Sequence, residues 1–138
     1  DHPLAEKAVI RLRDCSGQPA VLPRADAGVR QLLNVGMIRR NTELEIVAES
    51  DNQEFIHSYL KQEPVISFQI PIALPPGMLK SIGGENNVVA RPVDLSDVPA
   101  GILHVGQLKG RVLPVAAAKF LDTIITELSM RYSEDLDQ

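Results

Sequence analysis

Residues 44–60 read LEIVAESDNQEFIHSYL, and this stretch decides the fold class. Apolar residues at every second position of LEIVA (44–48) predict a β-strand. Ser50 then reads as the N-cap of a helix, with Gln53 at the third helical position of a capping box. The residues that follow place side chains at helical spacing, namely Phe55, Ile56, Tyr59 and Leu60. The stretch therefore predicts a strand, a tight turn and a helix.

A strand-to-helix turn is a candidate ligand site because it lies at the carboxyl edge of an α/β sheet, where ligands usually bind. Free backbone N–H groups and the helix dipole at such a turn favour an anionic or polar group. Here the turn contains Ser50 and Asp51. A plain helix cap explains the same residues equally well.

A second unit of the same kind precedes this stretch. Pro19–Pro23 contains the short apolar run Ala20–Leu22, which predicts a buried strand. The loop Arg24–Gly28 follows, with Asp26 as the expected N-cap of the next helix. One face of that helix carries the small or apolar residues Val29, Leu32, Leu33, Gly36 and Met37, and Asn41 is its expected stop.

Further elements are predicted toward the C-terminus. Apolar runs at Val65–Ile72, Val88–Ala90 and Ile102–Leu108 predict three more strands. From Pro114 to about Arg131 a helix is expected, with an apolar stripe of Ala117, Phe120, Leu121, Ile124, Ile125 and Leu128. The alternation of strands and helices predicts an α/β fold, with a parallel or mixed sheet flanked by helices.

Composition narrows the function classes. A chain of 138 residues with 44% hydrophobic residues suffices for one domain or two small lobes. The net charge of −4 argues against a chain that grips nucleic acid by itself. No apolar run approaches the roughly 20 residues of a membrane span. The single cysteine, Cys15, fits a reducing cytoplasm. Because the first residue is Asp1 rather than methionine, we expect a piece of a longer protein.

Signatures of catalysis are missing from the sequence. His2, His57 and His104 are too scattered for a metal motif, and Cys15 has no CxxC partner. No G-x-S-x-G elbow, P-loop or G-x-G-x-x-G is present. Asp51 and Glu54 could form an acid–base pair, but carboxylates in a first helical turn more often match the dipole. We therefore predict a binding domain, not an enzyme, with no metal and no cofactor.

Several segments together resemble the effector-binding domain of LysR-type transcriptional regulators. They are His2–Ala5, Val9, Leu12, Asp14, Pro19–Pro23, Gly28–Leu33, Glu49–Asn52, Pro71, Gly110-Arg111, Ala116-Ala117 and Phe120. The resemblance covers nearly the whole chain and implies a periplasmic-binding-protein-like (type 2) fold. It implies that residues 1–98 form the second lobe of such a domain. Residues 99–138 would then supply the hinge return, the closing strand and the C-terminal helix of the first lobe.

In such regulators a small-molecule effector sits in the cleft between the lobes. Carried onto this sequence, the second lobe's share is Arg24, Ala25, Asp26, Ala27, Gly28, Ser50, Asp51, Phe68 and Gln69. The resemblance also implies a cytoplasmic homo-oligomer that contacts DNA only through an N-terminal helix-turn-helix, which this chain lacks. With one lobe largely missing, we expect weak effector binding by this chain alone.

Two departures from the family pattern leave the effector's identity open. The loop Arg24–Gly28 reads RADAG where the family often has small hydroxyl residues, and Lys61–Ser67 lacks the family's Gly-x-Gly turn. Arg24 points to an anionic effector, although Asp26 beside it weakens that inference. A surface arginine without a ligand role is the plainer interpretation of Arg24.

A free-standing solute-binding or amino-acid-binding α/β domain is the alternative to the regulator. A helix-turn-helix upstream of Asp1 would decide for the regulator, whereas a signal peptide there would favour the solute-binding protein.

Overall fold

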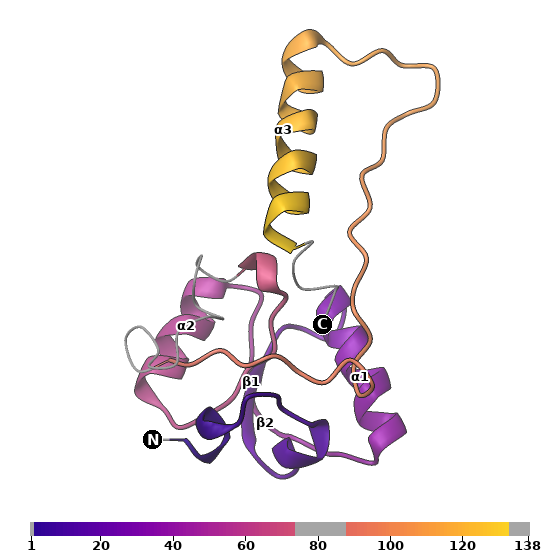
Figure 1. The fold of residues 1–138 in the computed structure, drawn as a ribbon. Helices are drawn as coiled ribbons and strands as arrows, with labels where there is room; N and C mark the ends of the chain where they lie inside the picture. Colours follow the sequence, from indigo (N-terminus) through magenta and orange to yellow (C-terminus); the bar gives the residue numbers. More distant parts are fainter. Residues whose placement is uncertain (1, 74–87, 133–138) are drawn as a thin grey trace. The chain divides into compact units, whose positions relative to one another are not determined.

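A computed structural model describes residues 2–73 and 88–132 of the chain. The chain divides into two units, Asp1–Ile102 (unit 1) and Leu103–Gln138 (unit 2), and each is described by itself. Unit 1 contains β1 (Pro19–Leu22), α1 (Gly28–Arg40), β2 (Glu45–Glu49) and α2 (Gln53–Gln62), and unit 2 contains α3 (Val115–Tyr132) (Figure 1). Short 3₁₀ helices occupy Pro3–Glu6, Leu12–Cys15 and Pro71–Ala73.

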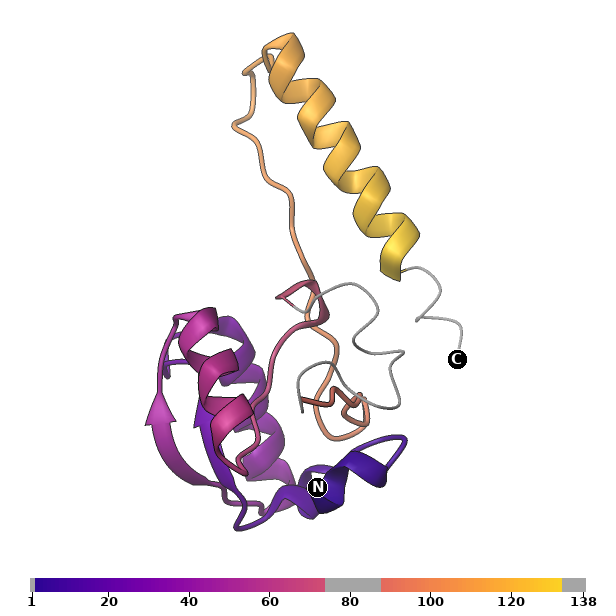
Figure 2. The ribbon, with the colours of Figure 1, turned by 90° about the vertical axis from the view of Figure 1, so that its left-hand side faces the viewer.

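The two strands run parallel, side by side, as the order strand–helix–strand predicts (Figure 2). Pro19 pairs with Glu45 and Leu22 with Glu49, with one irregularity in the register between Ala20 and Val21. The predicted strand, turn and helix of residues 44–60 are therefore confirmed.

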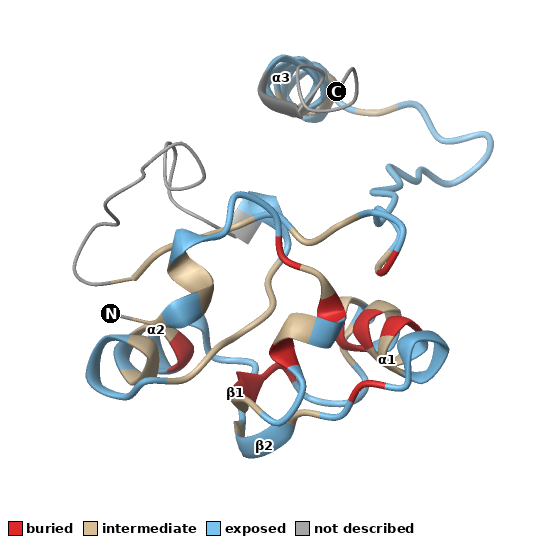
Figure 3. Cartoon of the chain, turned by 60° about the horizontal axis from the view of Figure 1, so that its bottom comes forward, coloured by how far each residue is buried: buried red, intermediate tan, exposed pale blue. Residues whose placement is uncertain are grey.

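The core of unit 1 lies around β1. Leu12, Ala20, Leu22 and Leu33 form one buried cluster, so β1 packs against α1 and the 3₁₀ helix Leu12–Cys15. Helix α2 contacts β1 as well, and its Ile56 is fully buried. Figure 3 shows buried residues on β1, α1 and α2 and on loop segments of unit 1. For unit 1, the predicted α/β class, with helices packed on a small sheet, is confirmed.

The sheet is smaller than the apolar runs predict. The predicted strand Val65–Ile72 is wrong: the segment makes one isolated bridge, Ile66 to Ala20, and then turns into the 3₁₀ helix at Pro71. Pairing cannot extend far because β1 has only four residues and prolines lack the N–H that a ladder requires. Phe68 packs against the core cluster without strand geometry.

Two other predicted strands are also wrong. Val88–Ala90 forms no regular strand: only Val88 makes an isolated bridge, and farther on Val93 bridges to Ile10. Ile102–Leu108 is irregular, and its residues are exposed. An apolar run becomes a strand only when a partner satisfies its backbone groups, and the described residues offer this segment none. Helix α3, by contrast, confirms the helix predicted from Pro114.

Helix ends agree with the prediction only in part. Asn41 ends α1 in the left-handed conformation with φ of 49°, as expected of an asparagine stop. The predicted N-cap Ser50 is wrong, because Asn52 caps α2 by accepting from Phe55 N–H at 3.1 Å. The predicted N-cap Asp26 is also wrong: the N-cap of α1 is Ala27, which has no capping side chain.

Asn52→Ala is expected to lower the free energy of unfolding of unit 1 by about 1 kcal/mol, because the N–H of Phe55 loses its acceptor. Ser50 accepts from the N–H of Asn52 at 3.1 Å in the exposed turn before the helix, so Ser50→Ala should cost less. Urea unfolding followed by far-UV circular dichroism measures both. A larger loss in Ser50→Ala than in Asn52→Ala would contradict this cap.

Gly36 on α1 lies against the turn at Asp97. A Cβ at this position would meet the carbonyl oxygen of Asp97 at 2.7 Å and the side chain of Leu12 at 2.9 Å. Gly36→Ala is therefore expected to destabilise unit 1 by about 1–2 kcal/mol, although alanine favours a helix interior over glycine by about 1 kcal/mol. Gly28→Ala, with open space around its Cβ, is the control and should be neutral or stabilising. Thermal unfolding of both variants measures the two changes in stability, and a Gly36→Ala variant as stable as Gly28→Ala would contradict the close approach at Gly36.

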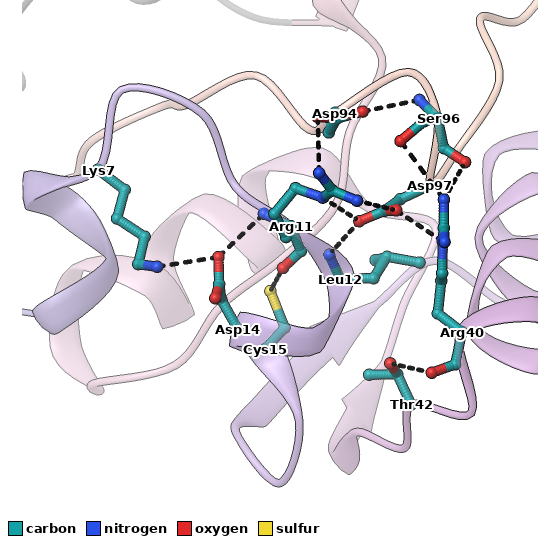
Figure 4. Close-up of polar contacts among 10 residues, drawn as sticks. All are labelled: Lys7, Arg11, Leu12, Asp14, Cys15, Arg40, Thr42, Asp94, Ser96 and Asp97. Atoms are coloured by element: carbon teal, nitrogen blue, oxygen red, sulfur yellow. Dashed lines mark hydrogen bonds and ion pairs between the residues drawn. The ribbon is translucent and has the colours of Figure 1, made fainter.

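Ion pairs and hydrogen bonds connect residues 94–97 to the rest of unit 1 (Figure 4). The carboxylate of Asp97, only 2% exposed, accepts from Leu12 N–H at 2.9 Å, from Arg11 Nε at 3.1 Å and pairs with Arg40 Nε at 2.7 Å. The hydrogen bond from Arg11 holds the pKa of Asp97 below its ordinary value, against the opposing effect of burial. The network joins three segments that are remote in sequence.

Candidate functional site

The two strand-to-helix loops meet at the carboxyl edge of the sheet. Because β1 and β2 are parallel, the loop after each strand emerges at the same edge. Ser50 N–H donates to Leu22 O at 3.0 Å, and Arg24 N–H donates to Asp51 Oδ1 at 3.2 Å. The structure thus brings Arg24 and Asp51, two predicted effector-binding residues, into direct contact.

Arg30 on the first turn of α1 holds this edge together. Its side chain is buried, and its Nη1 donates to Pro23 O at 2.9 Å and to Glu49 Oε1 at 2.6 Å. Pro23 directly follows β1 and Glu49 is the last residue of β2, so one guanidinium bonds to both strand ends.

Arg30 is not among the site residues predicted from the sequence. Its position three residues before Leu33, on the buried side of the helix, was the available signal. A buried arginine needs hydrogen-bond or ion-pair partners, and Arg30 finds them in Pro23 O and the Glu49 carboxylate.

Arg24 is the exposed cation of the edge. Its Nε lies 3.7 Å from Asp26 Oδ1 and 3.6 Å from Asp51 Oδ2, and all three side chains are more than half exposed. Exposed pairs of this length contribute little stability, so a ligand can replace either carboxylate at low cost. The three groups carry a net charge of −1, which opposes a free anion until one carboxylate swings away.

The N-terminus of α1 lies in the same loop. Ala27 is its N-cap, and Ala25, Asp26 and Gly28 surround it without a capping side chain. The first N–H groups of an α-helix have no partner within the helix and carry a partial positive charge. This end therefore offers donors beside Arg24.

Phe68 and Gln69 are not part of this cluster. Phe68 packs against the core cluster, and the amide atoms of Gln69 are buried without a hydrogen-bond partner among the described residues. The hydroxyl of Ser67 is likewise buried without a hydrogen-bond partner among the described residues. The structure therefore brings together the two loops but gives Phe68 and Gln69 no hydrogen bond or ion pair with them.

The family model for the LysR substrate binding domain matches residues 1–129 of the chain. The chain belongs to the LysR substrate binding domain family. A comparison with curated proteins finds no match. Domains of this family have a type 2 periplasmic-binding-protein-like fold, to which the parallel pair β1–β2 and its helices correspond.

Family membership points to effector sensing, because LysR substrate binding domains belong to transcriptional regulators, which are not enzymes. Within residues 2–73 and 88–132, no three potential metal-ligating side chains gather at one place, and no helix is long and apolar enough to cross a bilayer. Burial raises the pKa of the Cys15 thiol to about 11, so this cysteine is protonated at neutral pH.

Proposed function

We propose that this chain is the co-inducer-sensing part of a LysR-type DNA-binding regulator. The observation that carries the proposal is the convergence of two loops at one sheet edge in a LysR substrate binding domain. A ligand on this edge changes a regulator only if it binds one arrangement of the domain better than another. DNA contact would come from a helix-turn-helix outside these residues.

We further propose that the effector binds through an anionic group at the edge formed by Arg24–Gly28, Ser50 and Asp51. The uncapped start of α1 supplies backbone donors, and Arg24 supplies a cation whose present partners are held weakly. An incoming carboxylate would take the place of Asp51 on Arg24. We include Gln69 in this proposal because its buried side-chain amide has no hydrogen-bond partner among the described residues; it would bind a second polar group of the same molecule, apart from the contacts of the two loops.

Matched pairs of acid and amide test this proposal. We would titrate the ¹⁵N-labelled chain with benzoate and benzamide, and with succinate and succinamide, and follow the backbone amide resonances. The carboxylates, not the amides, should shift the resonances of residues 24–28 and 50–51. Arg24→Gln should weaken these shifts by about 2- to 5-fold, whereas Arg39→Gln, an exposed arginine near the C-terminal end of α1, should not. Equal shifts from acid and amide would contradict an anionic effector.

The regulator itself is tested on the natural gene product. Its intact mass should exceed 15.1 kDa and its additional residues should include a helix-turn-helix. A product of 15.1 kDa that binds no DNA would favour the free-standing solute-binding domain instead.

We propose that residues 1–98 form the second lobe and that residues 99–138 complete the first. Within unit 2, helix α3 leaves Phe120 and Ile125 exposed (68% and 46%), which supports an apolar partner for this helix. Without that partner, the chain should self-associate through α3. Light scattering at increasing concentration should show dimers or larger species, and Phe120→Asp should shift them toward monomers. A monomer at all concentrations would count against homo-oligomerisation of this chain.

A further inference from the structure

Helix α2 carries a surface pocket that the effector edge does not include. Its volume is about 290 Å³, which is at the lower end of the range for small-molecule sites. The described residues that line it lie along one side of the helix and at its C-cap, and we call them the α2 flank: Phe55, Ser58, Tyr59, Gln62 and Glu63.

Two aromatic rings form the apolar part of the α2 flank. The ring centroids of Phe55 and Tyr59 lie 5.8 Å apart, with an angle of 45° between the ring planes. Phe55 is 43% exposed, so its ring is accessible to a ligand. The face of an aromatic ring carries negative charge density and attracts cations.

The polar part of the α2 flank has the same electrostatic preference. Glu63, the C-cap of α2, supplies a carboxylate, and the C-terminal end of the helix carries the negative pole of its dipole. No described residue lining the pocket is basic. Lys61 lies two residues from both Tyr59 and Glu63, which places it on the opposite side of the helix.

We propose that the α2 flank binds a small organic cation, such as a methylated ammonium, between the aromatic rings and the Glu63 carboxylate. Ring faces, carboxylate and helix dipole all favour positive charge, while the small volume favours a free small molecule over a macromolecule. Ser58 and Gln62 offer hydrogen bonds to polar substituents of the same ligand. This proposal does not depend on the effector edge, because it uses none of its residues.

The test is a titration of the ¹⁵N-labelled 138-residue chain with tetramethylammonium chloride. Amide resonances of residues 55–63 should shift and saturate at roughly millimolar concentrations, because exposed cation–π contacts are weak. The neutral analogue tert-butanol and sodium chloride should not cause these shifts. Equal shifts with tert-butanol would overturn the proposal, since the site would then recognise only apolar bulk.

Variants of the flank separate its two components. Phe55→Leu and Glu63→Gln should each weaken binding of tetramethylammonium by about 2- to 5-fold, while Lys61→Gln, on the other side of the helix, should leave it unchanged. Circular dichroism checks that both variants keep their helices. If Phe55→Leu does not fold, the affinity of Glu63→Gln for tetramethylammonium is the deciding measurement. Wild-type affinity in Glu63→Gln would overturn the proposal. Shifts of the same resonances on raising the protein concentration alone would also overturn it, by assigning the flank to a second copy of the chain.

Discussion

Replacing Arg30 with methionine is expected to lower the free energy of unfolding of unit 1 by about 2–4 kcal/mol. The guanidinium donates to Pro23 O, Glu49 Oε1 and Asn34 Oδ1 at 2.9, 2.6 and 3.1 Å. Methionine fills much of the same space but leaves the buried Pro23 carbonyl without a donor. Because Glu49 is 43% exposed, its carboxylate can be rehydrated, which keeps the loss below that of a fully buried pair.

Urea unfolding monitored by circular dichroism measures this loss, and Arg39→Met is the matched control. Arg39 lies on the same helix but is exposed and makes no described contact, so its substitution should change the stability by less than about 0.5 kcal/mol. Amide exchange gives a second readout: Ser50 N–H, bonded to Leu22 O, should exchange faster in Arg30→Met. Equal stability of Arg30→Met and Arg39→Met would show that Arg30 does not hold the sheet edge.

Replacing Asp97 with asparagine is the second large effect, with an expected fall in Tm of roughly 10 °C for a domain of this size. Asparagine has nearly the same shape as aspartate, but the substitution removes the negative charge that pairs with Arg11 and Arg40. The NH₂ group of asparagine must also face one of these two guanidiniums, which are donors themselves. Glu43→Gln, an exposed carboxylate outside the network, is the control and should leave Tm nearly unchanged. Similar Tm values for the two variants would refute the role of the network.

The same substitution changes the pH dependence of stability. The pKa of Asp97 is lowered in the folded protein from its ordinary value of 3.8, chiefly by the hydrogen bond from Arg11. Its contribution is therefore fully present above that ordinary value and is lost as the pH falls through the lowered one. Asp97→Asn should make the acid limb of the stability curve shallower. Part of the acid pH dependence of stability should remain in this variant, because the pKa values of Asp14 and Asp94 are also lowered. An unchanged acid limb would contradict the assignment.

The sequence by itself determined the elements whose signals are local. Alternation over residues 44–48 and helical spacing from Phe55 predict β2 and α2, and Asn41 ends α1 because asparagine tolerates the left-handed conformation. The resemblance to LysR effector-binding domains was also available, since it rests on the order and spacing of residues. The strand, the helices and the Asn41 stop are decided by each residue and its near neighbours, whereas the resemblance needs only the order of segments along the chain.

Tertiary structure decided the features that need a partner remote in the chain. Val65–Ile72 and Ile102–Leu108 have the composition of strands, but strand geometry requires a row of hydrogen bonds to another segment. Among the described residues, Val65–Ile72 pairs with β1 only at Ile66, and Ile102–Leu108 pairs with no segment. The N-cap of α2 is Asn52 rather than Ser50, because the Ser50 hydroxyl accepts from Asn52 N–H in the turn before the helix. The N-cap of α1 is Ala27 rather than Asp26, whose carboxylate lies beside Arg24 instead. Arg30 and Asp97 became important only when folding placed Glu49, Arg11 and Arg40 around them. Sequence patterns report the preference of a residue, whereas a buried charge depends on which partners the fold brings to it.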